Sequence, residues 1–498
     1  MSALPSSGAA GVFAGLQPAI VWKHFATLCA IPRISKQEER LREHLRAWAQ
    51  ARGLAARVDA AGNLIVTKPA SAGREQAPAV VLQAHLDMVC QKNSDSAHDF
   101  TRDPITPSRE DGWLRARETT LGADNGIGVA LILAVLEDAA LVHGPLEALF
   151  TIDEETGMSG AQGLAGDALR ARTMLNLDTE EWGEFYLGCA GGIDVNVERA
   201  AAPQELPAGL TLCRIDLRGL RGGHSGVDIH EERGNAIKLL VRVLHDLQQR
   251  APLRLSALQG GTARNALPRE AYAVVGLPQA EAAALPAFLA ARQAALRAEL
   301  RGVDEGLSLT GTVLSQPAQV LPAAEQAIWL ASLHAAPHGV RRMSRQLPGV
   351  VETSNNLGMV DIGPAGGRCN FMVRSLLDAG TRALAEEIAS LFSLSGTCAV
   401  ASGAYPGWTP NPDSPLLRLC QGVYREQFGG DSAVKVIHAG LECGILGGKY
   451  PGMDIVSFGP TIRGAHAPGE SVEIATVANC WRLLCAILAR TADGAAVG

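Results

Sequence analysis

Hydrophobic and polar positions follow two different patterns along the chain. Residues 1–191 hold continuous apolar runs, such as 146–152, which predict strands buried on both faces. Residues 192–395 hold alternating strands, such as 210–220, separated by long helices. The first pattern returns over residues 396–498. We therefore predict an α/β domain that is interrupted by an inserted α+β domain.

The N-terminal region predicts two helices and a hairpin before the first buried strand. One helix is expected over residues 19–30. Ser35 and Glu38 form the capping-box pattern, in which each side chain accepts a backbone N–H at the start of a helix, so a second helix is expected there. Turn residues predict a hairpin over 56–66. The long polar segment 91–120 is expected to be a functional loop.

Composition narrows the class of protein without selecting an activity. The 498 residues are 47% hydrophobic and 19% charged, as expected for a globular protein with large cores. The net charge of -7 disfavours nucleic acid or an anionic membrane as a partner. No apolar stretch reaches the roughly 18 residues of a membrane span, and no signal peptide is evident. The ten scattered cysteines predict free, mostly buried thiols and a cytoplasmic location.

Polar residues gather just beyond the predicted buried strands. His85 and Asp87 follow an apolar run, and the period of 2 along a strand points both side chains to one face. The carboxyl ends of parallel strands are where ligands bind. The pair therefore predicts either a metal ligand with its orienting carboxylate or a structural contact. The other candidates, at strand ends and in glycine-rich turns, are Asp124, Glu154, Glu155, Asp178 and His466.

These carboxylates cannot share one buried cleft unless positive charge neutralises them. Lysine and arginine are largely absent from the segments concerned, and two divalent cations would balance the charge. We predict that Asp124 bridges the two ions, that His85 and Asp178 bind one, and that Glu155 and His466 bind the other. Imidazole and carboxylate ligands favour Zn²⁺, with Co²⁺ or Mn²⁺ as alternatives.

Two acids remain outside this ligand set. We predict Glu154 as the general base and Asp87 as the carboxylate that orients the His85 imidazole. Each signal alone also fits a structural role, because a His–x–Asp pair can be an internal contact and consecutive glutamates can be a solvated helix start. The joint pattern, with every residue just past a strand or in a glycine-rich turn, favours the metal site.

Five motifs resemble those of the di-zinc exopeptidases, a family that includes aminoacylases, glutamate-releasing carboxypeptidases, succinyl-diaminopimelate desuccinylase and carnosinases. The motifs are HLDMV, GADNGIG, DEETGMSGA, NLDTEE and GAHAPGE. The resemblance spans nearly the whole chain and implies the metal and base roles given above. It also implies a catalytic domain of mixed sheet with flanking helices, built from residues 1–191 and 396–498, and a lid domain over 192–395 that mediates homodimers.

The resemblance further implies substrate contacts from the lid domain. His224, in GGHSG, is expected to be catalytic by polarising the scissile carbonyl, in its own subunit or in that of the dimer partner. Arg374 is expected to bind the C-terminal carboxylate of the substrate, for which a guanidinium group is suited. Asn265 and Gly440 are also expected to contact the substrate.

Together the candidate residues and the resemblance favour a metal-dependent dipeptidase. It would hydrolyse unblocked dipeptides, including those that end in histidine, with an activated water. An amidohydrolase acting on N-acyl amino acids is the alternative, since it would use the same metal residues. The resemblance also implies dipeptide substrates through Asp178, because the dipeptidases of the family have aspartate at this position and some aminoacylases have glutamate. A non-catalytic metal-binding or peptide-binding scaffold is disfavoured, because the base and all five ligands are present.

Overall fold

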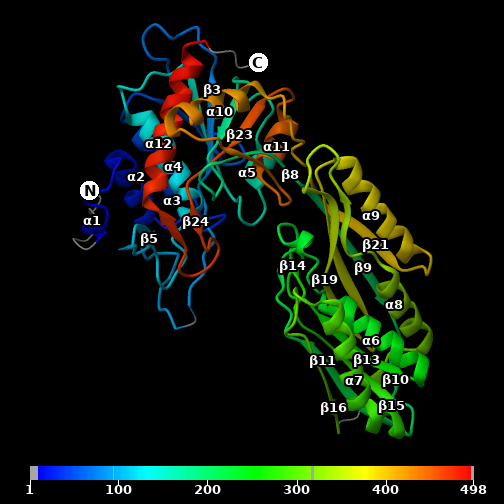
Figure 1. Ribbon diagram of the computed structural model, residues 1–498. Helices are drawn as coiled ribbons and strands as arrows, with labels where there is room; N and C mark the ends of the chain where they lie inside the picture. Colours follow the sequence, from blue (N-terminus) through cyan, green and yellow to red (C-terminus); the bar gives the residue numbers. More distant parts are fainter. Residues whose placement is uncertain (1–8, 94, 316–318, 495–498) are drawn as a thin grey trace. The chain divides into compact units, whose positions relative to one another are not determined.

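The chain folds into two compact units (Figure 1). The computed structural model describes residues 9–93, 95–315 and 319–494. The first unit comprises Met1–Gly188, Pro410–Val436 and Leu441–Gly498, and the second comprises Cys189–Thr409 and Ile437–Gly440.

A mixed sheet organises the first unit. Its strands are β1 (Ala55–Val58), β2 (Leu64–Lys68), β3 (Val80–His85), β6 (Leu146–Thr151), β7 (Thr173–Asn176), β8 (Glu184–Cys189), β22 (Ala433–Ile437) and β23 (Asp454–Ser457). Within the described residues the order is β1-β2-β6-β3-β7-β23-β8-β22. Strands β6, β3, β7 and β23 run parallel, so their carboxyl ends meet at one edge. β3 is buried at every residue, as its apolar run predicts.

A smaller sheet forms from two distant parts of the same unit. Its strands are β4 (Ser108–Glu110), β5 (Trp113–Arg115), β24 (Ile462–Arg463) and β25 (Ser471–Glu473), in the order β24-β25-β5-β4. The prediction of an irregular loop over residues 91–120 is therefore wrong in part. The two strands in that segment have three residues each, too few to show a clear alternation in the sequence.

Helices cover the sheet of the first unit. They are α1 (Ala9–Val12), α2 (Ala19–Cys29), α3 (Glu39–Gln50), α4 (Ala123–Glu137), α5 (Ser159–Gly163), α10 (Pro415–Phe428), α11 (Glu442–Lys449) and α12 (Ile474–Ala492). α4 packs against α2, α12 and β3 and is buried from Asn125 to Leu136 (Figure 1). α12 is long and apolar enough to cross a membrane by length and composition. Its Val477, Cys480 and Leu484 are, however, part of the unit's hydrophobic core.

The predicted capping box is wrong. Helix α3 begins at Glu39, and no side chain caps its N-terminus. Ser35 Oγ instead donates to Asp87 Oδ2 at 2.7 Å, and Glu38 Oε1 accepts the backbone N–H of Asp153 at 2.9 Å. Both side chains are thus bonded to residues just beyond strand ends, a tertiary arrangement that competes with local capping.

The second unit is an antiparallel sheet with helices on one face (Figure 1). Its strands are β9 (Gly191–Ala200), β10 (Gln204–Glu205), β11 (Leu210–Arg218), β12 (Gly223–His224), β13 (Arg254–Gly260), β14 (Ala266–Leu267), β15 (Ala271–Pro278), β16 (Ser308–Val313), β17 (Gln319–Val320), β18 (Gly339–Met343), β19 (Val351–Gly363), β20 (Gly366–Ser375) and β21 (Cys398–Tyr405). Its helices are η1 (Ile229–Glu231), α6 (Ala236–Arg250), α7 (Gln279–Glu299), α8 (Ala323–Ala335) and α9 (Asp378–Ser393). The main sheet runs β16-β11-β15-β13-β19-β20-β9-β21 over the described ranges, with β18 beside β19.

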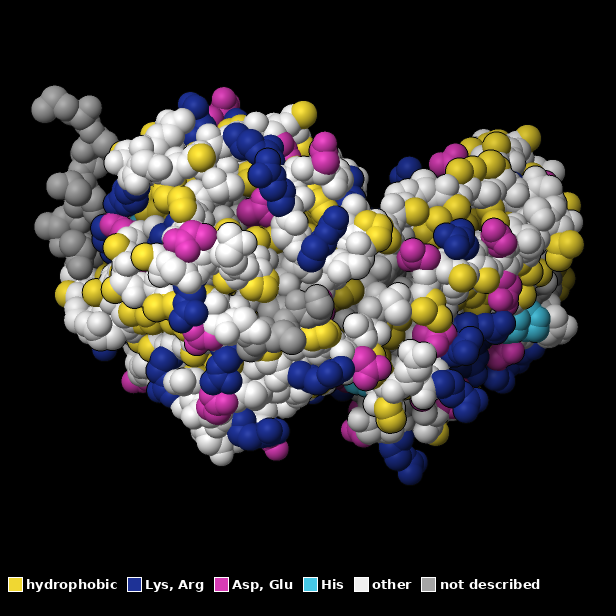
Figure 2. Space-filling view, turned by 90° about the horizontal axis from the view of Figure 1, so that it is seen from above, with side chains coloured by type: hydrophobic (Ala, Val, Ile, Leu, Met, Phe, Trp, Pro, Cys, Tyr) yellow, Lys and Arg dark blue, Asp and Glu magenta, His cyan; other side chains and the backbone are white. Residues whose placement is uncertain are grey.

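The alternation of buried and less buried residues along the strands explains which face of this sheet packs against the helices. Cys213, Ile215 and Leu217 on β11 are buried in one apolar core with α6, α7, α8 and α9, whereas the residues between them are less buried. β21 lies at the edge, and most of its residues are exposed. On the face of the molecule seen in Figure 2, Lys and Arg side chains are interspersed with Asp and Glu over each unit.

The boundary predicted after residue 395 differs from the observed one. Strand β21 pairs with β9 and so belongs to the second unit, which extends to Thr409 and also includes Ile437–Gly440. β21 has little apolar alternation because it is an exposed edge strand. The hydrophobic pattern along the sequence therefore changes at an earlier residue than the one at which the second unit ends.

Candidate active site

Parallel strands bring the predicted acids and histidine to one edge of the first unit's sheet. His85 is the last residue of β3 and is 1% exposed. Glu154 and Glu155 follow β6, and Asp178 follows β7 by two residues. The hydrogen-bond register pairs β3 with both of these strands, so the three strand ends lie together.

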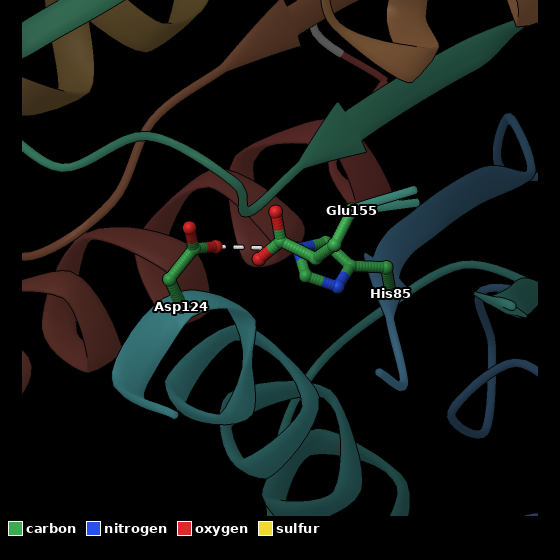
Figure 3. Close-up of side chains that lie close together, drawn as sticks. All are labelled: His85, Asp124 and Glu155. Atoms are coloured by element: carbon green, nitrogen blue, oxygen red, sulfur yellow. Dashed lines mark hydrogen bonds and ion pairs between the residues drawn. The ribbon is translucent and has the colours of Figure 1, made fainter. Parts of the chain in front are cut away.

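Asp124 reaches the same edge from the start of α4. The backbone of Asp124 and Asn125 is not helical, and the peptide bond between them is cis. Figure 3 shows the side chains of Asp124, His85 and Glu155 pointing toward one another. One ligand atom from each lies within 4.8 Å of the others, which is a spacing that could hold a metal ion.

Each oxygen of Asp124 contacts a different histidine. Oδ1 lies 3.2 Å from His85 Nε2, and Oδ2 lies 3.2 Å from His466 Nε2. His85 Nε2 is also 3.3 Å from Asp178 Oδ1, and His466 Nε2 is 3.1 Å from Glu155 Oε2. The five residues therefore divide into two groups of three that share Asp124. The assignment of these groups to two metal ions stays a prediction, since the trio of His85, Asp124 and Glu155 takes one residue from each predicted pair.

Asp87 links His85 to the acids that follow β6. Its Oδ1 lies 3.4 Å from His85 Nδ1, which also contacts the Asp87 carbonyl at 3.2 Å. The same carboxylate accepts the backbone N–H of Glu154 and of Glu155 at 3.0 and 3.1 Å. Burial opposes ionisation of Asp87, but the His85 contact and the Ser35 hydrogen bond outweigh it and lower its pKa to about 2. Asp87 contacts the ring nitrogen Nδ1, and its role in orienting the imidazole stays a prediction.

Burial disfavours the ionised form of three carboxyl groups at the site. Burial raises the pKa of Glu154 well above its usual value, and it also raises the pKa of Glu155 and of Asp178. Glu155 Oε1 is buried without a hydrogen-bond partner in the described part of the chain. Such a set of carboxylate oxygens fits divalent cations.

Both histidines respond to the surrounding carboxylates. Hydrogen bonds to Asp124 and Glu155 raise the pKa of His466 to about 11. Burial lowers the pKa of His85, but Asp178 and Asp124 outweigh burial and raise it well above its usual value. The surrounding carboxylates therefore stabilise positive charge at both rings.

Two charged residues that the sequence analysis missed hold the loop that carries Asp124. The Glu470 carboxylate is 2% exposed and accepts four successive backbone N–H groups, from Leu121 to Asp124, at 2.8 to 3.2 Å. Arg33 is 3% exposed and donates to the carbonyls of Asp87 and Gly122. Glu470 ends the GAHAPGE motif, which was a usable signal, whereas nothing local marks Arg33 as buried.

A third missed residue lies behind His85. Glu442, in the first turn of α11, is fully buried, and its Oε2 accepts from Gln83 Nε2 at 2.7 Å and Thr151 Oγ1 at 2.6 Å. Burial raises the pKa of Glu442 to about 8. Gln83 precedes His85 by two residues on β3, so this carboxyl group supports the strand end that carries the histidine.

The second unit holds all four residues that the resemblance links to the substrate. The Ser225 N–H, next to His224, donates to the Asn265 carbonyl at 2.8 Å. A Cβ atom placed on Gly226 would lie 3.1 Å from Arg374 Cδ, so the backbone at Gly226 passes close to the Arg374 side chain. Gly440 belongs to the same unit through the segment Ile437–Gly440.

The tautomer of His224 follows from its contacts. Nδ1 accepts the backbone N–H groups of Gly226 and Val227 at 3.2 and 2.9 Å. A neutral imidazole therefore carries its proton on Nε2 and can donate from that atom.

The whole chain matches known peptidases. The model of peptidase family M20/M25/M40 matches residues 81–490. The cytosol non-specific dipeptidase of Escherichia coli strain K12 is 45% identical over 473 residues, which cover 95% of this chain and 98% of that protein.

Two solved structures are similar to this chain to different degrees. Aminoacylhistidine dipeptidase from Vibrio alginolyticus is 44% identical, with a TM-score of 0.85 over 96% of this chain and 97% of the other. Aminopeptidase PepT from Bacillus cereus is 16% identical, with a TM-score of 0.55 over 96% of this chain and 99% of the other, and so shares the fold.

Proposed function

The chain belongs to peptidase family M20/M25/M40, and from this premise we propose that it is a dinuclear metal-dependent dipeptidase. Its substrates are unblocked dipeptides, including those that end in histidine. The observation that carries the proposal is Asp124, whose two oxygens each face a separate histidine–carboxylate pair. The 45% identical cytosol non-specific dipeptidase and the 44% identical aminoacylhistidine dipeptidase support the substrate class.

Five residues would hold the two ions. His85 and Asp178 would bind one, Glu155 and His466 the other, and Asp124 both. Zn²⁺ suits these ligands best, and Co²⁺ or Mn²⁺ could replace it. Bound there, the ions would polarise the peptide carbonyl and increase the acidity of water.

Glu154 is the general base of this mechanism. Within the described residues its carboxylate makes no hydrogen bond, while its backbone N–H is fixed by Asp87. It is thus available to take a proton from water and to return it to the leaving amine.

Residues of the second unit bind the substrate in this proposal. His224 donates its Nε2 proton to the developing oxyanion, and Arg374 binds the C-terminal carboxylate. Asn265 and Gly440 contact the substrate backbone. Recognition of a free carboxylate would limit the enzyme to short peptides. We also propose that the second unit acts as a lid and joins homodimers, for which a monomeric mass in sedimentation would be contrary evidence.

One purified sample can test the activity. We expect hydrolysis of Ala-His and β-Ala-His to exceed hydrolysis of N-acetyl amino acids, with two divalent ions per chain by elemental analysis. Faster turnover of N-acetyl amino acids would identify an amidohydrolase instead. A cytoplasmic location is part of the proposal and rests on the name of the Escherichia coli relative.

A further inference from the structure

Arg374 is a buried cation that has no anionic partner among the described residues. It is 4% exposed, and no carboxylate lies within ion-pair distance of it in the described ranges. Its Nε is buried without a hydrogen-bond partner. Its one hydrogen bond there runs from Nη1 to the hydroxyl oxygen of Tyr405, at 2.9 Å. A buried guanidinium held by a single phenol is poorly satisfied, which points to an anionic ligand.

The sheet places Tyr405 beside this arginine by register. Strand β9 lies between β20 and β21, and Gly192 on β9 is the register partner of both Arg374 and Tyr405. The three residues therefore form one row across the sheet. Because the middle position has no side chain, the phenol and the guanidinium can meet over it.

Two glycines also fix the position of the Tyr405 ring. A Cβ atom at Gly192 would lie 2.6 Å from the Tyr405 hydroxyl oxygen, and one at Gly440 would lie 2.9 Å from the ring. Both approaches are shorter than real Cβ contacts allow. The ring is thus seated against two positions where any side chain would displace it. Gly440, which the sequence suggests as a substrate contact, has this second reason to be glycine.

We propose that Tyr405 is a specificity-determining positioning residue, which fixes the Arg374 guanidinium so that its remaining N–H groups bind the C-terminal carboxylate of the substrate. This inference rests on the proposed function. The hydroxyl accepts from Nη1 and so sets the plane and rotation of the fork, since a bidentate pair needs a defined orientation. Burial raises the pKa of Tyr405, and the phenol therefore stays neutral beside the cation.

The inference is tested by comparing a dipeptide with its C-terminal amide in the full-length, metal-loaded enzyme. In Tyr405→Phe we expect kcat/KM for Ala-His to fall about 10-fold through KM, because an oriented charge-assisted contact is lost. Hydrolysis of Ala-His amide should change much less. Tyr272→Phe is the matched control, since its hydroxyl donates to Gln259 on the exposed side of the same unit. It should leave both substrates unchanged.

A second variant and a double mutant separate positioning from a structural role. Gly192→Ala should reproduce the loss with the phenol still present, because its methyl group would displace the hydroxyl. In an Arg374→Ala background, Tyr405→Phe should cause no further change in the ratio of kcat/KM for Ala-His to kcat/KM for Ala-His amide. An equal loss for both substrates, or an unchanged ratio, would overturn the inference. Wild-type protein that cleaves no dipeptide would instead contradict the proposed function.

Discussion

The two units differ in which buried charge lacks an ionic partner among the described residues. In the first unit, carboxylates and histidines converge at the edge of a parallel sheet, and the acids exceed the cations that could neutralise them. In the second unit, one buried guanidinium, that of Arg374, has no carboxylate beside it in the described residues. Under the proposed function, metal ions neutralise the negative charge, and an anionic substrate group pairs with the positive charge. We infer that chemistry is assigned to one unit and recognition to the other.

The largest expected effect is on the base of the first unit. Glu154→Gln should lower kcat about 10³-fold, because proton transfer by a positioned carboxylate is lost while the side chain keeps its size. Metal content should stay at the wild-type level, since Glu154 is not a ligand. Steady-state kinetics and elemental analysis check both expectations. Activity near that of the wild type would remove Glu154 from the mechanism.

The second-largest effect is expected from loss of the Glu470 carboxylate, which accepts the backbone N–H groups of the loop that carries Asp124. Glu470→Ala leaves four buried backbone N–H groups without an acceptor and should lower the free energy of unfolding by about 3 kcal/mol. Activity should fall about 100-fold, as for other residues that orient metal ligands. Glu118→Gln, an exposed change, is the control. If Glu470→Ala kept full metal affinity, the loop would not need this support.

Acid should weaken the second unit through His338, a half-buried histidine that is neutral in the folded state. Burial lowers the pKa of His338 to about 4, against an ordinary value of 6.5. The unfolded chain therefore binds more protons between these values, so stability is complete above pH 6.5 and falls as the pH drops toward 4. The loss for this one group is roughly 3 kcal/mol. Hydrogen exchange in peptides of α6 and β19 measures it, with His338→Asn as the variant in which the slope should disappear.

The smallest expected effect comes from Ser35. Ser35→Ala removes the hydrogen bond to Asp87 and should lower kcat a few-fold and unfolding free energy by about 1 kcal/mol. Hydrogen exchange in helix α3 should be unchanged, because Ser35 does not cap it. Selective loss of protection at the start of α3 would show that the capping interpretation was right after all.

The sequence was sufficient to name the residues of the candidate metal site, whose metal-binding roles stay predictions. Apolar runs marked β3, β6 and β7, and polar residues directly after each run identified His85, Glu155 and Asp178. The structure places these residues together because parallel strands align their carboxyl ends. The role of Ser35 could not be predicted from the sequence. The same pattern of Ser35 followed by Glu38 fits both a local capping box and hydrogen bonds to distant residues.

Long-range contacts explain the other failures. Glu470 and Asp124 are separated by 346 positions, and no local pattern reports a carboxylate that binds distant backbone groups. Strand β21 was assigned to the wrong unit, because an exposed edge strand lacks the alternation that reveals its neighbours. Tyr405 became a candidate once the register across Gly192 was known.

Metal content in wild type and Asp124→Asn tests the central claim most directly. If one carboxylate serves both sites, the wild-type chain should retain two divalent ions after dialysis, and Asp124→Asn should retain fewer than one, with folded secondary structure by circular dichroism. His466→Ala, which removes a ligand from one group alone, should retain one. Two ions bound to Asp124→Asn, or a single ion in the wild type, would contradict the shared carboxylate and the dinuclear site built on it.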